Sequence, residues 1–211
     1  LSSNGSLKIH TELQGGPVTY DFDELIVLVQ GFQLDSATQL EREPYLYADD
    51  IDVVINNYSI NLPDSLHRFE AEEIGVSTSR NEVYGREIEV MPRISKRRFA
   101  RLQRLHKNLF AIKVPEFKAT GIDLWKVYYD HLIDLDELYL QSPEFEVVHH
   151  PSEEDNPQRL DIRNLYPLIE GSYSSVSADR VNIDNGKVHF ESLGPNKVRD
   201  LALSGVSLDL N

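Results

Sequence analysis

The sequence predicts an all-β protein in which an antiparallel meander of bulged strands forms a curved sheet, either groove-like or part of a sandwich, with one short amphipathic helix. Three observations lead to this prediction. A short apolar pattern recurs with the spacing of β-strands, turn-forming residues separate several of its copies, and one segment breaks the β pattern with a helical stripe. Because 211 residues do not require two domains, we expect a single elongated β domain over residues 1–211.

The recurring pattern is apolar, any, apolar, any, any, apolar, any, apolar. Steps of two keep side chains on one face of a strand, whereas the step of three moves the next apolar residue to the other face. A β-bulge at that step restores the face and bends the strand, and a tight turn between two very short strands is the alternative. The copies are Tyr20/Phe22/Leu25/Val27, Leu46/Ala48/Ile51/Val53, Phe69/Ala71/Ile74/Val76, Val83/Gly85/Ile88/Val90, Phe117/Ala119/Ile122/Leu124, Ile133/Leu135/Leu138/Leu140, Val176/Ala178/Val181/Ile183 and Leu201/Leu203/Val206/Leu208.

Turn and loop signals lie between the copies. Asp184-Asn185-Gly186 predicts a hairpin turn between Ile183 and Lys187, because Asn-Gly readily supplies two positive φ values. The acidic, proline-containing stretch 151–159 is typical of an exposed loop. Consecutive strands are therefore expected to pair antiparallel.

One segment, Ser95 to Phe110, predicts a short basic amphipathic helix near residues 95–109, with Ser95 as its N-cap. Its apolar stripe contains Phe99, Leu102 and Leu109. The stripe is expected to dock on the sheet, and contact with an anionic membrane surface is the alternative. The cations available for such a contact are Arg97, Arg101, Arg104 and Lys107.

Composition and charge exclude several classes of function. The net charge of −14 argues against nucleic acid as a partner, and the absence of cysteine excludes disulfides and thiolate zinc sites. No apolar run approaches the roughly 20 residues of a membrane span. Since the chain begins at Leu1 without Met, we expect a fragment of a longer repeat-containing chain whose N-terminal anchor lies outside it.

The sequence predicts no catalytic residue, no metal site and no cofactor. It contains no phosphate-binding loop, dinucleotide fingerprint, nucleophile elbow or zinc-protease motif. His149-His150, followed by several acids, could suggest a metal site. Adjacent side chains on a strand point to opposite faces, however, so a solvated loop is the better interpretation. We therefore expect a protein that is not an enzyme.

The apolar face of the predicted sheet is the candidate site. It could be closed by a second sheet in a sandwich, or stay partly open as a groove in which acyl chains bind. The residues expected to face a lipid in such a groove are Phe22, Leu25, Val27, Ile51, Val53, Ile74, Val76, Ile122 and Leu124.

Several stretches resemble the strands of AsmA-like envelope proteins. They are Leu66–Thr78 (LHRFEAEEIGVST), Phe117–Leu124 (FKATGIDL) and Val176–Ile183 (VSADRVNI), and Met91–Phe99 (MPRISKRRF) resembles a connector of the same group. The resemblance, which extends to TamB-like proteins, covers most of the chain and rests on apolar spacing.

The resemblance implies a protein of the periplasm of a two-membrane bacterium, anchored in the inner membrane in its full-length form. It implies phospholipid as the ligand and other envelope proteins as possible partners, and it brings no catalytic residues. We therefore expect a non-enzymatic module that holds or guides acyl chains in lipid transport or outer-membrane biogenesis. The alternatives are a sandwich or solenoid scaffold that binds another envelope protein and, with only Trp125 as an indication, a carbohydrate-binding domain.

Overall fold

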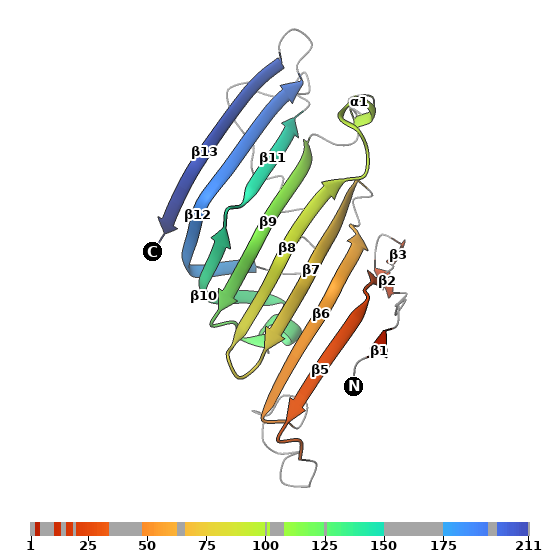
Figure 1. The fold of residues 1–211 in the computed structure, drawn as a ribbon, viewed down its shortest axis with the longest axis vertical. Helices are drawn as coiled ribbons and strands as arrows, with labels where there is room; N and C mark the ends of the chain where they lie inside the picture. Colours follow the sequence, from red (N-terminus) through yellow and green to blue (C-terminus); the bar gives the residue numbers. More distant parts are fainter. Residues whose placement is uncertain are drawn as a thin grey trace.

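The protein is one large β-sheet accompanied by short helical segments (Figure 1), which confirms the predicted all-β class. The computed structural model describes residues 3–4, 11–13, 16–18, 20–33, 48–62, 66–99, 101, 108–124, 126–149, 175–193 and 198–210. The elements are β1 (Ser3–Asn4), β2 (Thr11–Leu13), β3 (Gly16–Val18), β4 (Tyr20–Asp21), β5 (Glu24–Gln30), β6 (Asp50–Asn61), β7 (His67–Ser77), β8 (Glu82–Pro92), α1 (Lys96–Phe99), β9 (Asn108–Thr120), the π-helix η2 (Lys126–Asp130), β10 (Leu132–Gln141), β11 (Glu144–His149), β12 (Ser175–Leu193) and β13 (Val198–Leu210).

Eleven of these strands form one sheet, and β2 and β3 form a separate pair. From β5 to β10 the strands follow one another as an antiparallel meander, as predicted. β10 and β11 lie one after the other along β9, so together they occupy one position in the sheet. β12 pairs parallel with both of them, which departs from the predicted meander, and β13 returns antiparallel beside β12.

The hairpin predicted at Asp184-Asn185-Gly186 is wrong, because β12 passes through these residues without reversing. Asn185 has a positive φ of 52°, but its neighbours Asp184 and Gly186 stay in the strand. A two-residue hairpin turn of type I′ needs two successive residues with positive φ. A single one kinks the strand instead.

One irregular residue in almost every strand lies on a line across the whole sheet, which we call the crease. Asn56 pairs with Glu73 and Tyr58 with Ala71, so Asn57 and Glu72 oppose each other without pairing. The same gap recurs at the same level on the neighbouring strands. The crease comprises Asp23, Asn57, Glu72, Glu87, Pro115, Ser142, Asn185 and Gly205.

Residue types at the crease suit an unpaired, kinked backbone. Asn57, Asn185 and Gly205 have positive φ angles of 53°, 52° and 66°, a region that asparagine and glycine tolerate better than other residues. Pro115 has no N–H group, so at this position it loses no hydrogen bond of the ladder. Asn57 also donates a hydrogen bond from Nδ2 to Oδ2 of Asp23, 2.9 Å away.

The crease explains the three-residue step of the repeat. Side chains on either side of it alternate out of phase, so apolar residues three apart share one face. β7, β8 and β13 are continuous through the crease, which favours an irregularity within a strand over a turn between two strands. From β4 to β12, neighbouring strands each have their unpaired residue at the crease. The strands therefore pair in the same register on both sides of it. The copies that step here begin at Tyr20, Phe69, Val83 and Leu201.

The other four copies step at a second line of irregular residues nearer one end of the sheet. Gly121 there opposes Asp136, and Gly31 opposes Asp49. Both glycines have positive φ, of 71° and 66°, and the aspartate side chains fill the space that a Cβ would occupy, so each position requires glycine. In Figure 1, β12 bends sharply close to its start, where Asp179 lies on this line.

The predicted helix is confirmed only in its first turn. The Arg98 N–H donates to Oγ of Ser95 at 3.3 Å, which fits the predicted N-cap, and α1 ends at Phe99. Its predicted end is wrong, because Asn108, Leu109 and Phe110 belong to β9, where Leu109 pairs with Val148 and Phe110 with Val147. Of the helices in the described ranges, none has the length and apolar character needed to cross a bilayer.

Buried side chains form three clusters at successive levels of the sheet. Phe99 of α1 packs with Leu66, Leu109 and Val148 at one end. Ala71, Ile88 and Val114 form the central cluster, and Ala119, Ile122 and Leu135 form the third, against which Val127 of η2 packs. Within the described residues no second large sheet covers the first, so they give the sandwich alternative no support.

Candidate ligand-binding face

Apolar side chains form continuous rows across one face of the sheet, which we call the apolar face. Directly opposed residues of paired strands share a face, so each row can be followed through the register. The first row is Val27, Val53, Val76, Val83, Ala119, Leu138 and Val181. The second row is Leu25, Ile55, Ile74, Gly85, Phe117, Leu140, Ile183 and Leu208.

A third row lies beyond the crease on the same face. It consists of Ile60, Phe69, Val90, Ile112, Phe145, Val188 and Leu203. None of its members was among the residues predicted to face a lipid, although Phe69, Val90 and Leu203 belong to copies of the repeat. Phe145 and Val188 alternate with polar neighbours, and that alternation was the available signal.

The centre of the apolar face is buried and its margins are exposed. Ala71, Ile88 and Val114 are buried at the centre. At one margin, Val27 on β5 is 46% exposed, and at the other, Leu203 and Leu208 on β13 are 50% and 39% exposed. An apolar ligand would therefore first meet this face at β5 or β13.

The structure brings together most of the residues predicted to face a lipid. Ile51 pairs with Val29, one row beyond Val27 and Val53 on the same face. Ile122 and Leu124 follow β9 and pack in the third buried cluster, and Phe22 lies half-buried between β4 and β5. The remaining predicted residues lie in the first two rows: Leu25, Val27, Val53, Ile74 and Val76.

The opposite face, which we call the polar face, carries charges of alternating sign. Lys113 Nζ lies 2.8 Å from Oε1 of Glu89, and Lys187 pairs with Glu144 on the next two strands. The hydrogen bond to Glu89 raises the pKa of Lys113, and the hydrogen bond from Lys187 lowers the pKa of Glu144. These groups are exposed, so solvent weakens their contribution to stability.

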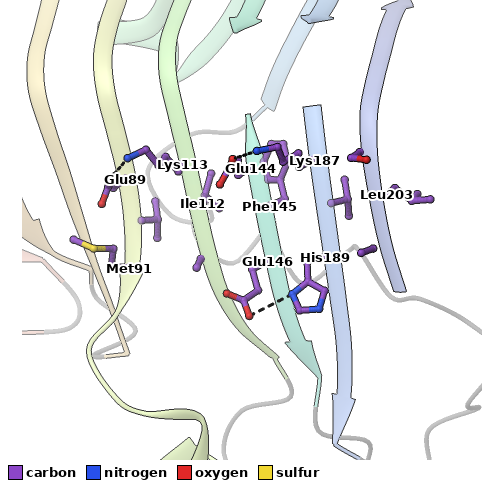
Figure 2. A pocket seen from close by; sticks show the side chains of 15 residues that line it. Glu89, Met91, Ile112, Lys113, Glu144, Phe145, Glu146, Lys187, His189 and Leu203 are labelled. Atoms are coloured by element: carbon purple, nitrogen blue, oxygen red, sulfur yellow. Dashed lines mark hydrogen bonds and ion pairs between the residues drawn. The ribbon is translucent and has the colours of Figure 1, made fainter. Parts of the chain in front are cut away.

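A shallow trough of about 430 Å³ crosses the polar face over β8, β9, β11, β12 and β13 (Figure 2). Ion pairs of Glu89 with Lys113 and of Glu144 with Lys187 form one wall, and Glu146 with His189 forms part of the other. Between the two walls lie third-row residues whose side chains belong to the apolar face, so strand backbone forms the floor of the trough: Val90, Ile112, Phe145, Val188 and Leu203. Ala111 and Ala202 are small, so the wall that contains Glu146 and His189 is low at these positions.

The predicted cationic contact is only partly described. Arg97 and Arg101 are exposed, whereas Arg104 and Lys107 lie outside the described residues. Lys96, which was not among the predicted residues, attaches α1 to the sheet: its Nζ lies 2.6 Å from Glu146 and 2.7 Å from Glu191. The hydrogen bond to Glu146 raises the pKa of Lys96. No sequence signal indicates this contact, because its partners lie 50 and 95 residues away.

Two histidines of the described residues, His67 and His149, contact neighbouring strands. His149 Nδ1 lies 2.6 Å from Oδ1 of Asn108, and its ring stacks on Phe190 with centroids 6.2 Å apart. His67 is buried, and its Nε2 accepts a 3.0 Å hydrogen bond from the Phe110 N–H. The remainder of the loop predicted after His149 lies outside the described residues.

Comparisons with known proteins add no assignment to these surfaces. No protein-family model matches the chain, and neither a curated protein nor a solved structure matches it significantly. The function must therefore be inferred from the two faces of the sheet and from its edges.

Proposed function

We propose that this protein is a non-enzymatic cell-envelope module that holds or guides lipid acyl chains along its apolar face. The observation that supports this most directly is the set of three apolar rows, which cross the sheet and reach exposed residues such as Val27, Leu203 and Leu208. Neighbouring strands are about 4.8 Å apart, so an acyl chain lying along a row would contact an apolar side chain at nearly every strand. Each methylene removed from water contributes about 0.8 kcal/mol.

The resemblance to AsmA-like proteins supports phospholipid as the ligand and the periplasm as the location. In this proposal the full-length protein is anchored in the inner membrane, and other envelope proteins are further partners. The polar face, with its paired charges, keeps the opposite side of the sheet solvated. Because the contacts along a row are non-directional, binding would select for hydrocarbon rather than for one headgroup.

Native mass spectrometry of the protein purified from cells tests this proposal. We expect wild-type protein to carry phospholipid and the double variant Leu201→Asp, Leu208→Asp to lose it, because both leucines are exposed on the apolar face of β13. The matched control is Ser204→Asp, Ser207→Asp, which adds the same charge to the polar face of the same strand. The control should retain lipid, and all three proteins should share one β circular dichroism spectrum.

Two outcomes would contradict the proposal. One is a wild-type protein that stays lipid-free both after purification and after incubation with phospholipid vesicles. The other is equal loss of lipid from the leucine variant and the serine control, because this would show that added charge, rather than the apolar face, determines binding.

The scaffold alternative is favoured by a different observation, the trough on the polar face. Its alternating lysines and glutamates offer ion-pair partners to an extended polypeptide of another envelope protein. Lys187→Glu should then abolish protein binding and leave lipid binding unchanged. The carbohydrate-binding alternative depended on Trp125, which lies outside the described residues.

A further inference from the structure

A group of arginines at α1, which we call the arginine corner, carries positive charge that the described part of the chain does not neutralise. No acidic residue occurs between Glu89 and Glu116, although the whole chain has a net charge of −14. Within the described ranges, no member of the corner forms an ion pair with a carboxylate. All the members are exposed: Arg93, Arg97, Arg98 and Arg101.

Cations on the polar face of the sheet are matched with acids. Arg86 Nη2 lies 2.8 Å from Oε2 of Glu73, and Lys113 pairs with Glu89 at the same distance. The corner differs from this alternating pattern, because its guanidinium groups keep their donors for a group outside the described residues. Arginine binds phosphate or carboxylate oxygens through two parallel hydrogen bonds. The corner is therefore suited to an external anion.

The sheet holds α1 in an orientation that presents these arginines to solvent. Phe99 is only 1% exposed and packs in the buried cluster at this end, and Lys96 is held by two carboxylates of the sheet. The Arg101 N–H donates to the Arg98 carbonyl at 3.1 Å, so the turn continues after α1. Helical positions i, i+1 and i+4 lie within an arc of about 100°. Arg97 therefore shares one exposed side with Arg98 and Arg101.

The apolar face reaches the same end of the sheet. α1 lies where β8, β11 and β12 end (Figure 1). Leu201 there is 55% exposed, and Glu191, the neighbour of Phe190, binds Lys96 of α1. Cations near exposed apolar side chains are the combination that binds the surface of an anionic bilayer. Beyond the third row, a fourth row on the apolar face consists of Phe110, Val147, Phe190 and Leu201.

We propose that the arginine corner binds the phosphate groups of an anionic phospholipid bilayer, with the strands of the sheet extending away from the membrane. This contact brings the exposed end of the fourth row to the lipid surface, where acyl chains have a short path to the apolar face. An acidic protein also offers anions to arginine, so the choice of a bilayer rests on the proposed function, in which the module exchanges lipid with a membrane.

Vesicle flotation tests the contact. We expect wild-type protein to float with vesicles of phosphatidylglycerol and phosphatidylcholine in equal parts, and to stay unbound with phosphatidylcholine alone. Each cation near an anionic surface strengthens binding roughly fivefold, so removing three should weaken it about 100-fold. Added salt should weaken the binding of wild-type protein in the same direction. The variant is Arg97→Gln, Arg98→Gln, Arg101→Gln, which keeps Phe99 and Lys96 and should therefore keep the fold.

A matched control removes the same charge from exposed cations that already pair with acids. It should bind the anionic vesicles like wild type, and all three proteins should share one β circular dichroism spectrum. The control is Arg80→Gln, Arg86→Gln, Lys118→Gln.

Three outcomes would overturn the membrane contact: wild-type protein that does not float with the anionic vesicles, equal flotation with both kinds of vesicle, or unchanged binding of the arginine variant. The corner would then be left to an acidic protein or to an acidic segment of this chain.

This contact and the lipid proposal fail separately. The arginine variant leaves the apolar rows intact, so native mass spectrometry should still find phospholipid on it. Phospholipid on a wild-type protein that ignores anionic vesicles would contradict only the contact, and flotation of a lipid-free protein would contradict only the binding of acyl chains.

Discussion

The two faces of the sheet differ in what stabilises them. On the apolar face Ala71, Ile88 and Val114 are buried in a common cluster, whereas on the polar face the ion pair of Arg86 with Glu73 is largely solvated. Burial of apolar area is worth several times more than an exposed ion pair. Over the middle of the sheet the apolar face is therefore expected to hold the fold together, and the polar face mainly to keep it soluble. At the α1 end the polar face has a buried cluster of its own, in which Leu109 and Val148 pack under Phe99. This division leaves the exposed margins of the apolar rows available for a ligand.

The largest expected effect is the difference in stability loss between substitutions at Ile88 and at Arg86, two residues of β8 on opposite faces. Ile88→Ala should lower the free energy of unfolding by about 2–4 kcal/mol, because Ile88 is only 7% exposed and its loss leaves a cavity. Arg86→Ala should lower it by about 0–1 kcal/mol, because the 2.8 Å pair with Glu73 is exposed. Urea unfolding followed by circular dichroism measures both values, and similar losses would contradict the division between the faces.

Two glycines, one on each face, sharpen the comparison. A Cβ on Gly85 would lie 2.4 Å from the Phe117 ring on the apolar face, and a Cβ on Gly75 would lie 2.1 Å from the Tyr84 ring on the polar face. Phe117 packs against the central cluster and cannot move freely, whereas the end of the Tyr84 ring can shift toward solvent. Gly85→Ala should therefore cost about 1–3 kcal/mol.

Gly75→Ala should cost less than Gly85→Ala in the same urea titration. Shortening the obstructing ring provides the control: Phe117→Leu combined with Gly85→Ala should recover part of the loss. Equal costs for the two glycine variants would show that the aromatic rings are held equally firmly on both faces.

The sequence predicts well the features of the fold that depend on local spacing. The alternation of apolar residues and the three-residue step identify the strands and their apolar face, because side-chain direction in a strand follows from adjacent residues. Leu25, Val27, Ile51, Val53, Ile74 and Val76 were assigned to one face for this reason, and the register places them there.

Features that depend on distant pairing could not be predicted in the same way. The alignment of Asn57, Glu87 and Asn185 into one crease requires the register of strands far apart in the sequence. The Asn-Gly pair in β12 has the local composition of a hairpin, and only parallel pairing with β10 and β11 shows that the strand continues. The contact of Lys96 with Glu191 is equally non-local.

A substitution at the crease, which interrupts both faces, should change the free energy of unfolding by a smaller amount than the substitutions above. Glu87 has a φ of 45° there, which is unfavourable for a residue with a long side chain, whereas asparagine adopts this region more readily. Glu87→Asn should therefore raise the free energy of unfolding by about 0.5–1 kcal/mol. The pair with Lys113, at 3.5 Å and exposed, is a minor loss. The control, Glu72→Asn on the adjacent strand, has no positive φ to relieve, and a stabilisation as large as that of Glu87→Asn would contradict this explanation.

The smallest expected effect is the pH dependence of an exposed ion pair on the polar face, which the buried cluster of Ala71, Ile88 and Val114 on the apolar face does not share. The hydrogen bond from Lys187 lowers the pKa of Glu144 below its ordinary 4.5, so this pair stabilises the folded state above that pH. The contribution is lost as the pH falls through the lowered pKa, because the protonated carboxyl no longer pairs with lysine. Lys187→Gln should therefore be slightly less stable than wild type at neutral pH and equal to it in acid, and added salt should shrink the difference. The stability lost in Ile88→Ala does not depend on a charge, so it should be the same at every pH at which the protein folds. If that loss became smaller in acid, as the loss in Lys187→Gln should, the stability contributions of the two faces would not be independent.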